Sequence, residues 1–358
     1  MLALPRKNPK SPWESSHVEY LGDPPPQPLE VIEDDSKSIL SENASPDVGF
    51  RFSVNAYRGC YHGCAYCYAR PSHEYLGFGA GVDFERKIVV KRRAPALLRA
   101  ALQKKSWVRQ TVALSGNTDA YQPLEATYEL SRGCLEVFAE FENPVHVITK
   151  APLIERDLDL LGPMAAAGLA SVSISVPFWN AENARKVEPG VATPQRRILA
   201  VERLAAAGVP VNVLVAPIIP GLTDKDVVHV LEAAARAGAT SASRVMLRLP
   251  GNVLPVFEER IREGFPLAAE KILARTREVR GGKLNDPRFG SRMRGEGEYA
   301  DAIHHLFETT AKRLGLSTRR EGGSAEEPVL SSQAETKARP VSAGRPVPPR
   351  GQLSLFEF

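Results

Sequence analysis

Short apolar segments alternate with amphipathic stretches of about a dozen residues through the middle of the chain. A good example of an amphipathic stretch is the helix predicted over 194–207, where Thr193 can cap the first turn and Gly208 can end the last. This alternation predicts βαβ units joined in a parallel sheet. The predicted strands cover residues 51–57, 111–114, 145–149, 170–176, 211–215 and 243–249, and a helix is predicted over residues 126–140 between the second and third of them.

The segments on either side of this region have different patterns. Residues 1–48 are rich in proline, serine and acidic residues without a sustained period, and predict a disordered or surface-wrapping lead-in. The alternating units occupy residues 49–265, and residues 266–316 predict a helical extension. Residues 317–351 have the composition of a disordered linker, and residues 352–358 form a terminal peptide motif.

The bulk composition limits the class of protein. The chain has 358 residues, of which 43% are hydrophobic and 25% charged, as in globular proteins that fold in water. It has no run of about 18 apolar residues that could span a membrane, and its first residues lack the apolar core of a secretory signal. A formal net charge of +4 permits nucleic-acid binding without requiring it. Four cysteines, mostly clustered, argue against a disulfide scaffold, so we expect a reducing, cytoplasmic location.

Three of the four cysteines lie together with the spacing C-x3-C-x2-C. Thiolates at Cys60, Cys64 and Cys67 could hold three irons of a [4Fe–4S] cluster and leave the fourth iron open to a substrate or cosubstrate. The alternatives are unligated thiols or a structural zinc site with His62 or Cys134 as fourth ligand. The sequence has no second cysteine pair, which zinc sites commonly use, so the spacing favours the cluster.

The motif, with an aromatic residue before its third cysteine, resembles the signature of the radical S-adenosylmethionine (SAM) enzymes. The resemblance covers roughly residues 50–315 and is strongest over residues 53–78, where the chain is similar to spore photoproduct lyase and its DNA-repair relatives. It implies an α/β fold, a partial (β/α)6 TIM-like barrel of parallel strands with a C-terminal helical extension and disordered tails. It also implies a [4Fe–4S] cluster whose open iron binds SAM, and an electron transfer that cleaves SAM to a 5′-deoxyadenosyl radical.

The resemblance assigns roles to several residues near the cysteines and at the carboxyl ends of strands. It implies that Tyr66 lies beside the adenine of SAM, and that Tyr68 is a second aromatic residue of the cofactor site. It implies that Lys150, after the strand at 145–149, pairs with the SAM carboxylate. Ordinary packing is the alternative for a single tyrosine.

The loop after the strand at 111–114 is rich in small polar residues. In the family this position holds the amino group of SAM, which makes Ser115 or Thr118 the candidate. Asp119, Gln122 and Glu125 could orient a substrate, or they could cap the following helix.

Later strands supply further candidates. Ser173 and Ser175 lie on one face of a predicted strand and suit ribose hydroxyls or the SAM carboxylate, or else form a polar stripe that lines the barrel. Arg248, at the end of the last predicted strand, is placed to face the cavity. The basic run at 288–294 could contact phosphate, and a solvated linker is an equal alternative.

The chain departs from spore photoproduct lyase at the residue that returns hydrogen to the product. The lyase uses a cysteine on the loop after the second strand, whereas this loop has no thiol and Cys134 falls on the following helix as a predicted core residue. Tyr121 is therefore our candidate hydrogen donor. Together with Lys150 it is a predicted catalytic residue.

The last residues resemble the peptide with which bacterial DNA-repair and replication proteins bind the sliding clamp. A flexible tether before it would raise the local concentration of the enzyme on DNA. The alternative is a tail that folds back onto an apolar groove of its own chain. The motif consists of Gln352, Leu353, Ser354, Leu355 and Phe356.

These observations predict a radical SAM enzyme with lyase-like chemistry that acts on damaged DNA or another nucleic acid. A flavodoxin, ferredoxin or reductase would supply its electron. The alternatives are a radical SAM enzyme that modifies a protein or small molecule, and a metal-binding protein without catalysis.

Overall fold

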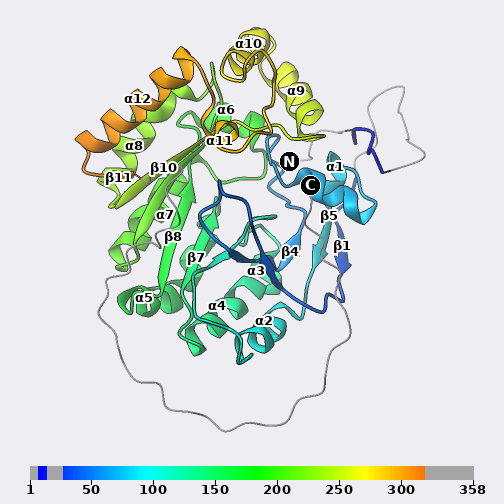
Figure 1. Cartoon of the computed structure of the whole chain (residues 1–358), viewed down its shortest axis with the longest axis vertical. Helices are drawn as coiled ribbons and strands as arrows, with labels where there is room; N and C mark the ends of the chain where they lie inside the picture. The colour runs from blue at the N-terminus through cyan, green and yellow to red at the C-terminus, as the bar shows by residue number, and fades with distance from the viewer. Residues whose placement is uncertain (1–6, 14–26, 319–358) are drawn as a thin grey trace.

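The computed structural model describes residues 7–13 and 27–318. A mostly parallel sheet of eight strands forms its centre (Figure 1). The strands are β2 (Leu40–Glu42), β3 (Phe52–Val54), β6 (Val112–Leu114), β7 (Val145–Thr149), β8 (Ala170–Ser175), β9 (Val211–Ile218), β10 (Ser241–Met246) and β11 (Ser317–Thr318). Their order is β11-β10-β9-β8-β7-β6-β3-β2, and only β2 and β3 pair in antiparallel fashion. This arrangement confirms the predicted α/β fold with a partial barrel.

Helices follow the strands and cover the outer face of the sheet. Valine and isoleucine side chains at alternate strand positions pack under these helices in one large core, because successive side chains of a strand point to opposite faces. The longer helices are α2 (Ala94–Leu102), α4 (Leu130–Glu140), α5 (Leu158–Ala166), α7 (Pro194–Ala206), α8 (Val227–Arg236), α9 (Val253–Gly264), α10 (Ala269–Glu278) and α12 (Glu298–Arg313). Figure 1 shows α12 beside α8 at the β10 end of the sheet. None of the helices in the described part of the chain is both long and apolar enough to cross a bilayer.

A second sheet of three strands supports the cysteine segment. It consists of β1 (Glu30–Glu33), β5 (Lys87–Val90) and β4 (Tyr57–Arg58) in that order. Figure 1 places β1 and β5 on the opposite side of the molecule from β10 and β11. The described part of the lead-in therefore adds β1 to this small sheet and β2 to the main one.

Two predicted elements are divided in the structure. The strand predicted over 51–57 becomes β3 in the main sheet and β4 in the small one, because the chain leaves one sheet for the other between them. The helix predicted over 126–140 is interrupted at Glu129, whose φ of 49° is left-handed. The break has a physical reason: the carboxylate of Glu125 accepts hydrogen bonds from the backbone N–H groups of Ser131 and Arg132, and so caps the helix that begins there.

The described part of the chain also contains shorter helices. They are the 3-10 helix η1 (Arg70–Leu76) and the helices α1 (Val82–Arg86), α3 (Glu125–Tyr128), α6 (Ala181–Val187) and α11 (Ser291–Arg294); two further 3-10 helices are η2 (Pro152–Asp157) and η3 (Asp224–Asp226). The helix predicted from 194 is α7, and the Thr193 side chain caps it by accepting from the N–H of Arg196.

A buried histidine in η1 gives the first testable prediction. The ring of His73 is fully buried between Phe78 and Phe84, and its Nε2 donates to the carbonyl oxygen of Lys87 at 2.9 Å. Burial lowers the pKa of His73 to about 4, against an ordinary value of about 6.5. The unfolded chain therefore binds the proton first, so the stabilisation is complete above about pH 6.5 and is lost as pH falls toward 4.

We expect this histidine to account for about 3 kcal/mol of acid destabilisation across that interval. Urea unfolding at pH 7 and pH 5 measures about 2 kcal/mol of this loss, with His73→Gln as the comparison because glutamine keeps an N–H donor for Lys87. The variant should lose less stability than the wild type between the two pH values. Equal losses in both proteins would contradict the assignment.

Candidate functional site

The three clustered cysteines lie on the loop that follows β4. All are free thiols, with Cys60 and Cys64 buried and Cys67 half-buried. Burial and the negative charge of Glu188 raise the pKa of Cys64 well above its ordinary value. Cys60 and Cys67 raise this pKa further, so the three sulfur atoms lie within electrostatic reach of one another. A positively charged iron cluster would remove this repulsion by binding the thiolates.

The donor set fits a [4Fe–4S] cluster. Each thiolate of such a cluster binds a different iron, so its ligands need not converge on one ion as zinc ligands do. Within residues 7–13 and 27–318 no group of three His, Cys, Asp or Glu side chains converges in that way. Cys134 lies fully buried in α4, where its electrostatic partner is Glu125. It therefore belongs to the core.

A buried arginine fixes the middle of the cysteine loop. The fully buried Arg70 donates through Nε and Nη2 to the carbonyl oxygen of Cys64 at 3.0 and 2.8 Å, and pairs with Glu85 at 2.6 Å. Gly59 allows the preceding turn, because its φ is +75° and a Cβ there would lie 2.9 Å from the carbonyl oxygen of Phe84. The sequence carries no signal for this role of Arg70, since arginine is usually a surface residue.

The loop after β6 holds the backbone on both sides of Cys60. The Thr118 hydroxyl donates to the carbonyl oxygen of Gly59 at 2.6 Å. Gln122 donates to the same oxygen at 3.2 Å and accepts from the N–H of Tyr61 at 3.0 Å. Thr118, a predicted SAM-binding residue, therefore also positions the cysteine loop.

Replacing Gln122 tests this arrangement. Gln122→Ala leaves the backbone N–H of Tyr61 without its partner and the carbonyl oxygen of Gly59 with the Thr118 hydroxyl alone, so we expect a loss of about 2 kcal/mol in the free energy of unfolding and a lower iron content after anaerobic gel filtration. Gln195→Ala is the control, because its exposed side chain makes one surface hydrogen bond. Equal iron content in the two variants would contradict the role of Gln122.

A second link joins the cysteine loop to the end of β7. The Nδ1 atom of His62 lies 3.5 Å from Asp119, which also accepts from the Thr149 hydroxyl and the N–H of Lys150 at 2.6 and 2.8 Å. Burial opposes the charge of Asp119, but His62 and these two donors outweigh it and lower the pKa of Asp119 to about 2. Burial likewise opposes the charge of His62, and Cys60 and Asp119 raise its pKa to about 10.

Lys150 and Tyr66 face each other beside the cysteines. The Lys150 Nζ lies 5.7 Å from the centre of the Tyr66 ring. Burial disfavours the lysine cation, but Cys64, Glu188 and Asp119 outweigh burial and raise its pKa. Lys150 is therefore a fixed positive charge beside the cysteine loop, as a carboxylate-binding residue would need to be.

A buried ion pair fixes the hydroxyl end of Tyr66. The Tyr66 hydroxyl donates to the carboxylate of Glu188, which pairs with Arg197. Both charged side chains are almost fully buried, and Arg197 also donates to the carbonyl oxygen of Ser175 at 3.0 Å. Neither member of this pair carried a signal in the sequence.

The predicted serines have partners within the barrel. Ser115 donates to the carbonyl oxygen of Thr118 at 2.5 Å, and Ser175 to that of Ala216 at 3.0 Å. Ser173 accepts from the Asn212 amide at 3.0 Å. Ser173 also belongs to a polar layer across β7 to β10, which contains His146, Ser171, Ser173, Asn212 and Ser243.

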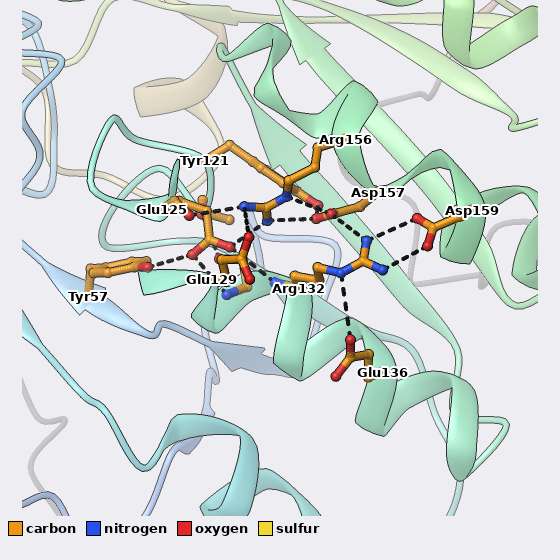
Figure 2. Close-up of polar contacts among 11 residues, drawn as sticks. Tyr57, Tyr121, Glu125, Glu129, Arg132, Glu136, Arg156, Asp157 and Asp159 are labelled. Carbon is orange, nitrogen blue, oxygen red and sulfur yellow. Dashed lines mark hydrogen bonds and ion pairs between the residues drawn. The ribbon is translucent and has the colours of Figure 1, made fainter. Parts of the chain in front are cut away.

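The two tyrosines with predicted site roles lie in different surroundings. Tyr68 is 55% exposed and its hydroxyl donates to the carbonyl oxygen of Gly116 at 2.6 Å, above the loop after β6. Tyr121 is buried, and Figure 2 shows its hydroxyl pointing to Asp157, at 2.9 Å, within a network of charged residues. A role as hydrogen donor would require this hydroxyl to leave Asp157.

That network joins α3 and α4 to η2, the 3-10 helix that precedes α5. Arg156 pairs with Glu125 and Arg132 with Asp157, at 2.8 and 2.9 Å, and the Tyr57 hydroxyl donates to Glu125 (Figure 2). It thus connects β4, which leads into the cysteine loop, with the outer helices. The terminal motif at 352–356 lies outside the described residues.

Comparison with known proteins places this site in a family. The radical SAM superfamily model matches residues 54–234. An uncharacterized protein of Mycobacterium tuberculosis is 43% identical over 205 residues, 57% of this chain and 60% of that protein. A radical SAM Nalpha-GlyT isomerase of Pseudomonas phage M6 is 23% identical over 84% of this chain and 60% of its own length. The chain thus spans about three fifths of these relatives.

Among solved structures the chain is similar to spore photoproduct lyase. A mutant of that lyase with bound AdoMet and dinucleoside spore photoproduct gives a TM-score of 0.56 at 15% identity, covering 81% of each chain. This similarity supports the fold. The family match covers half of the chain, from β3 into α8. The protein therefore belongs to the radical SAM superfamily, whose cofactors are a [4Fe–4S] cluster and SAM.

Proposed function

We propose that this protein is an enzyme that cleaves SAM reductively and uses the radical to act on damaged DNA or another nucleic acid. The observation that carries the proposal is that Cys60, Cys64 and Cys67 lie within electrostatic reach of one another, beside the charged Lys150 and the ring of Tyr66. When bound, the cluster supplies the electron that converts SAM to a 5′-deoxyadenosyl radical. The carboxyl ends of parallel strands are where such barrels bind their ligands.

The protein's own residues would bind and orient SAM. Lys150 is held charged and is suited to pair with the SAM carboxylate. The Tyr66 ring, fixed through Glu188 and Arg197, offers a flat apolar face for the adenine. Thr118, Ser115 and Tyr68 each donate their hydroxyl hydrogen to a backbone carbonyl oxygen, and we propose that their hydroxyl oxygens are further contacts for the cosubstrate.

The nucleic-acid substrate is the part of the proposal that rests on similarity of fold. Spore photoproduct lyase, which shares the fold over 81% of both chains, has been solved with a dinucleoside spore photoproduct bound. A rearrangement is the second candidate, because the phage relative named as an isomerase matches 84% of this chain. Modification of a protein or small molecule is the remaining alternative.

Anaerobic turnover tests the proposal. The reconstituted protein is incubated with reductant, SAM deuterated at its 5′ carbon, and ultraviolet-damaged or undamaged DNA. We expect 5′-deoxyadenosine and a change in the damaged DNA, with hydrogen from the DNA appearing at the 5′ carbon of 5′-deoxyadenosine or of SAM. An isomerase would give a DNA product of unchanged mass. Formation of 5′-deoxyadenosine with no change in either DNA would contradict the nucleic-acid substrate and leave SAM cleavage standing.

A further inference from the structure

Arg248 forms no ion pair within the part of the chain that the structure describes, and it lies at the strand ends that carry the candidate site. It follows β10 by two residues, at the strand ends where the cysteine loop also lies, and its side chain is half-buried. Its guanidinium donates to the sulfur of Met293 at 3.6 Å, a weak contact. Over residues 7–13 and 27–318 no carboxylate lies within ion-pair distance of Arg248, although it is close enough to Tyr68 and Asp47 to interact electrostatically.

Two arginines of the neighbouring basic run at 288–294 form ion pairs within the protein. Arg288 pairs with Asp286 and Glu296 at 2.8 and 2.9 Å. Arg292 pairs with Asp47 at 2.6 Å. The sequence pointed to the whole run at 288–294 as a candidate phosphate contact, but the structure leaves these two guanidinium groups neutralised and Arg248 uncompensated.

The local field around Arg248 favours an anion. Burial and the like charge of Arg292 disfavour the cation of Arg248, and because Tyr68 and Asp47 offset them only in part, the pKa of Arg248 is lowered. The nearby Arg280 is held by the carbonyl oxygens of Met246 and Leu247, and Arg248 adds to the effect of burial in lowering its pKa to about 10. An oxyanion bound to Arg248 would relieve this repulsion.

Exposed aromatic rings lie in the same surroundings. Tyr68 is 55% exposed, and Phe289 is 61% exposed with the guanidinium carbon of Arg292 at 4.2 Å from its ring centre. Proteins that bind single-stranded nucleic acids combine backbone contacts from basic residues with aromatic side chains on which bases stack. A phosphate beside Arg248 with bases on such rings follows that pattern.

We propose that Arg248 binds a phosphate group of the nucleic-acid substrate at the mouth of the site, with Tyr68 and Phe289 contacting the adjoining bases. This inference rests on the proposed function, since it names the group that positions that substrate. The SAM carboxylate is an oxyanion of the same chemistry, so the test separates the two. Lys150, charged and beside Tyr66, already serves that carboxylate in the proposed function.

The test uses the reconstituted full chain and Arg248→Gln, with Arg248→Lys to keep the charge. Fluorescence anisotropy measures binding of labelled single-stranded and duplex DNA between about 50 and 200 mM salt. A separate titration measures SAM affinity. Arg288→Gln is the matched control, because it makes the same substitution at a guanidinium that two carboxylates already neutralise. Equal iron content and melting curves establish that each variant folds.

We expect Arg248→Gln to weaken DNA binding about tenfold and to reduce the slope of log K against log salt by about 0.7 to 0.9. Arg248→Lys should keep most of the slope, and Arg288→Gln should keep both values. If the wild type binds DNA and Arg248→Gln binds it equally well, this inference is wrong and the proposed function is unaffected. The same holds if Arg248→Gln loses affinity for SAM but not for DNA. A wild type that cleaves SAM but binds no DNA would overturn the nucleic-acid substrate as well.

Discussion

Replacing Cys64 by alanine is expected to abolish reductive cleavage of SAM. With two thiolates left, the protein cannot hold three irons of a cluster, and no other sulfur is placed to replace the third, because Cys134 lies buried in α4. After anaerobic reconstitution, 5′-deoxyadenosine should fall to the level of a reaction without protein. Chromatography of the quenched reaction measures it.

Cys134→Ala is the matched control for this experiment. It also removes one thiol from a buried position, and it should cost about 1 kcal/mol of stability through the small cavity that it leaves. Its iron content and 5′-deoxyadenosine yield should equal those of the wild type. Activity that survives in Cys64→Ala, or that disappears in Cys134→Ala, would contradict the assignment of the three ligands.

Replacing Arg197 by methionine is expected to lower the free energy of unfolding by about 3 to 5 kcal/mol, the largest stability effect that we predict. The substitution leaves the carboxylate of Glu188 buried without its cation. It also leaves Glu188, the acceptor of the Tyr66 hydroxyl, without the ion pair that fixes its position, so SAM binding should weaken along with stability. Urea unfolding of the anaerobic protein and a SAM titration at low urea separate the two effects.

A second arginine on α7 supplies the control. Arg203 pairs with Glu155, but its side chain is 52% exposed, so Arg203→Met should cost less than about 1 kcal/mol. A double variant, Arg197→Met with Glu188→Leu, removes both charges and should recover part of the lost stability. If Arg197→Met and Arg203→Met lose equal free energy of unfolding, burial of the Arg197–Glu188 pair has no energetic consequence. The predicted cost of an uncompensated buried carboxylate would then be wrong.

The fold could be predicted from the sequence because its signals are local. The alternation of strands and helices, and the cap at Thr193, depend on residues near one another in the chain. Errors occurred where distant contacts decide the outcome. The carboxylate of Glu125 ends one helix and begins the next at Glu129, and pairing with β5 draws part of the first predicted strand into another sheet.

The candidate site also contains residues that local sequence signals predict and residues whose roles depend on distant contacts. The cysteine spacing predicts the cluster ligands, because three thiols so close in sequence have few other uses. The residues that hold the ligand loop, Arg70 and Gln122, have no sequence signal, since their roles come from burial against that loop. The guanidinium of Arg248 could not be distinguished from the paired ones at 288–294 before the partners of each were known.

The central claim is that three thiolates hold a four-iron cluster with one iron open to SAM. Electron paramagnetic resonance of the reconstituted, reduced protein, recorded with and without SAM, tests it most directly. We predict the signal of a reduced [4Fe–4S] cluster and a change in its g-values when SAM is added. A protein that gives no such signal, or one whose spectrum is the same with and without SAM, would contradict the claim.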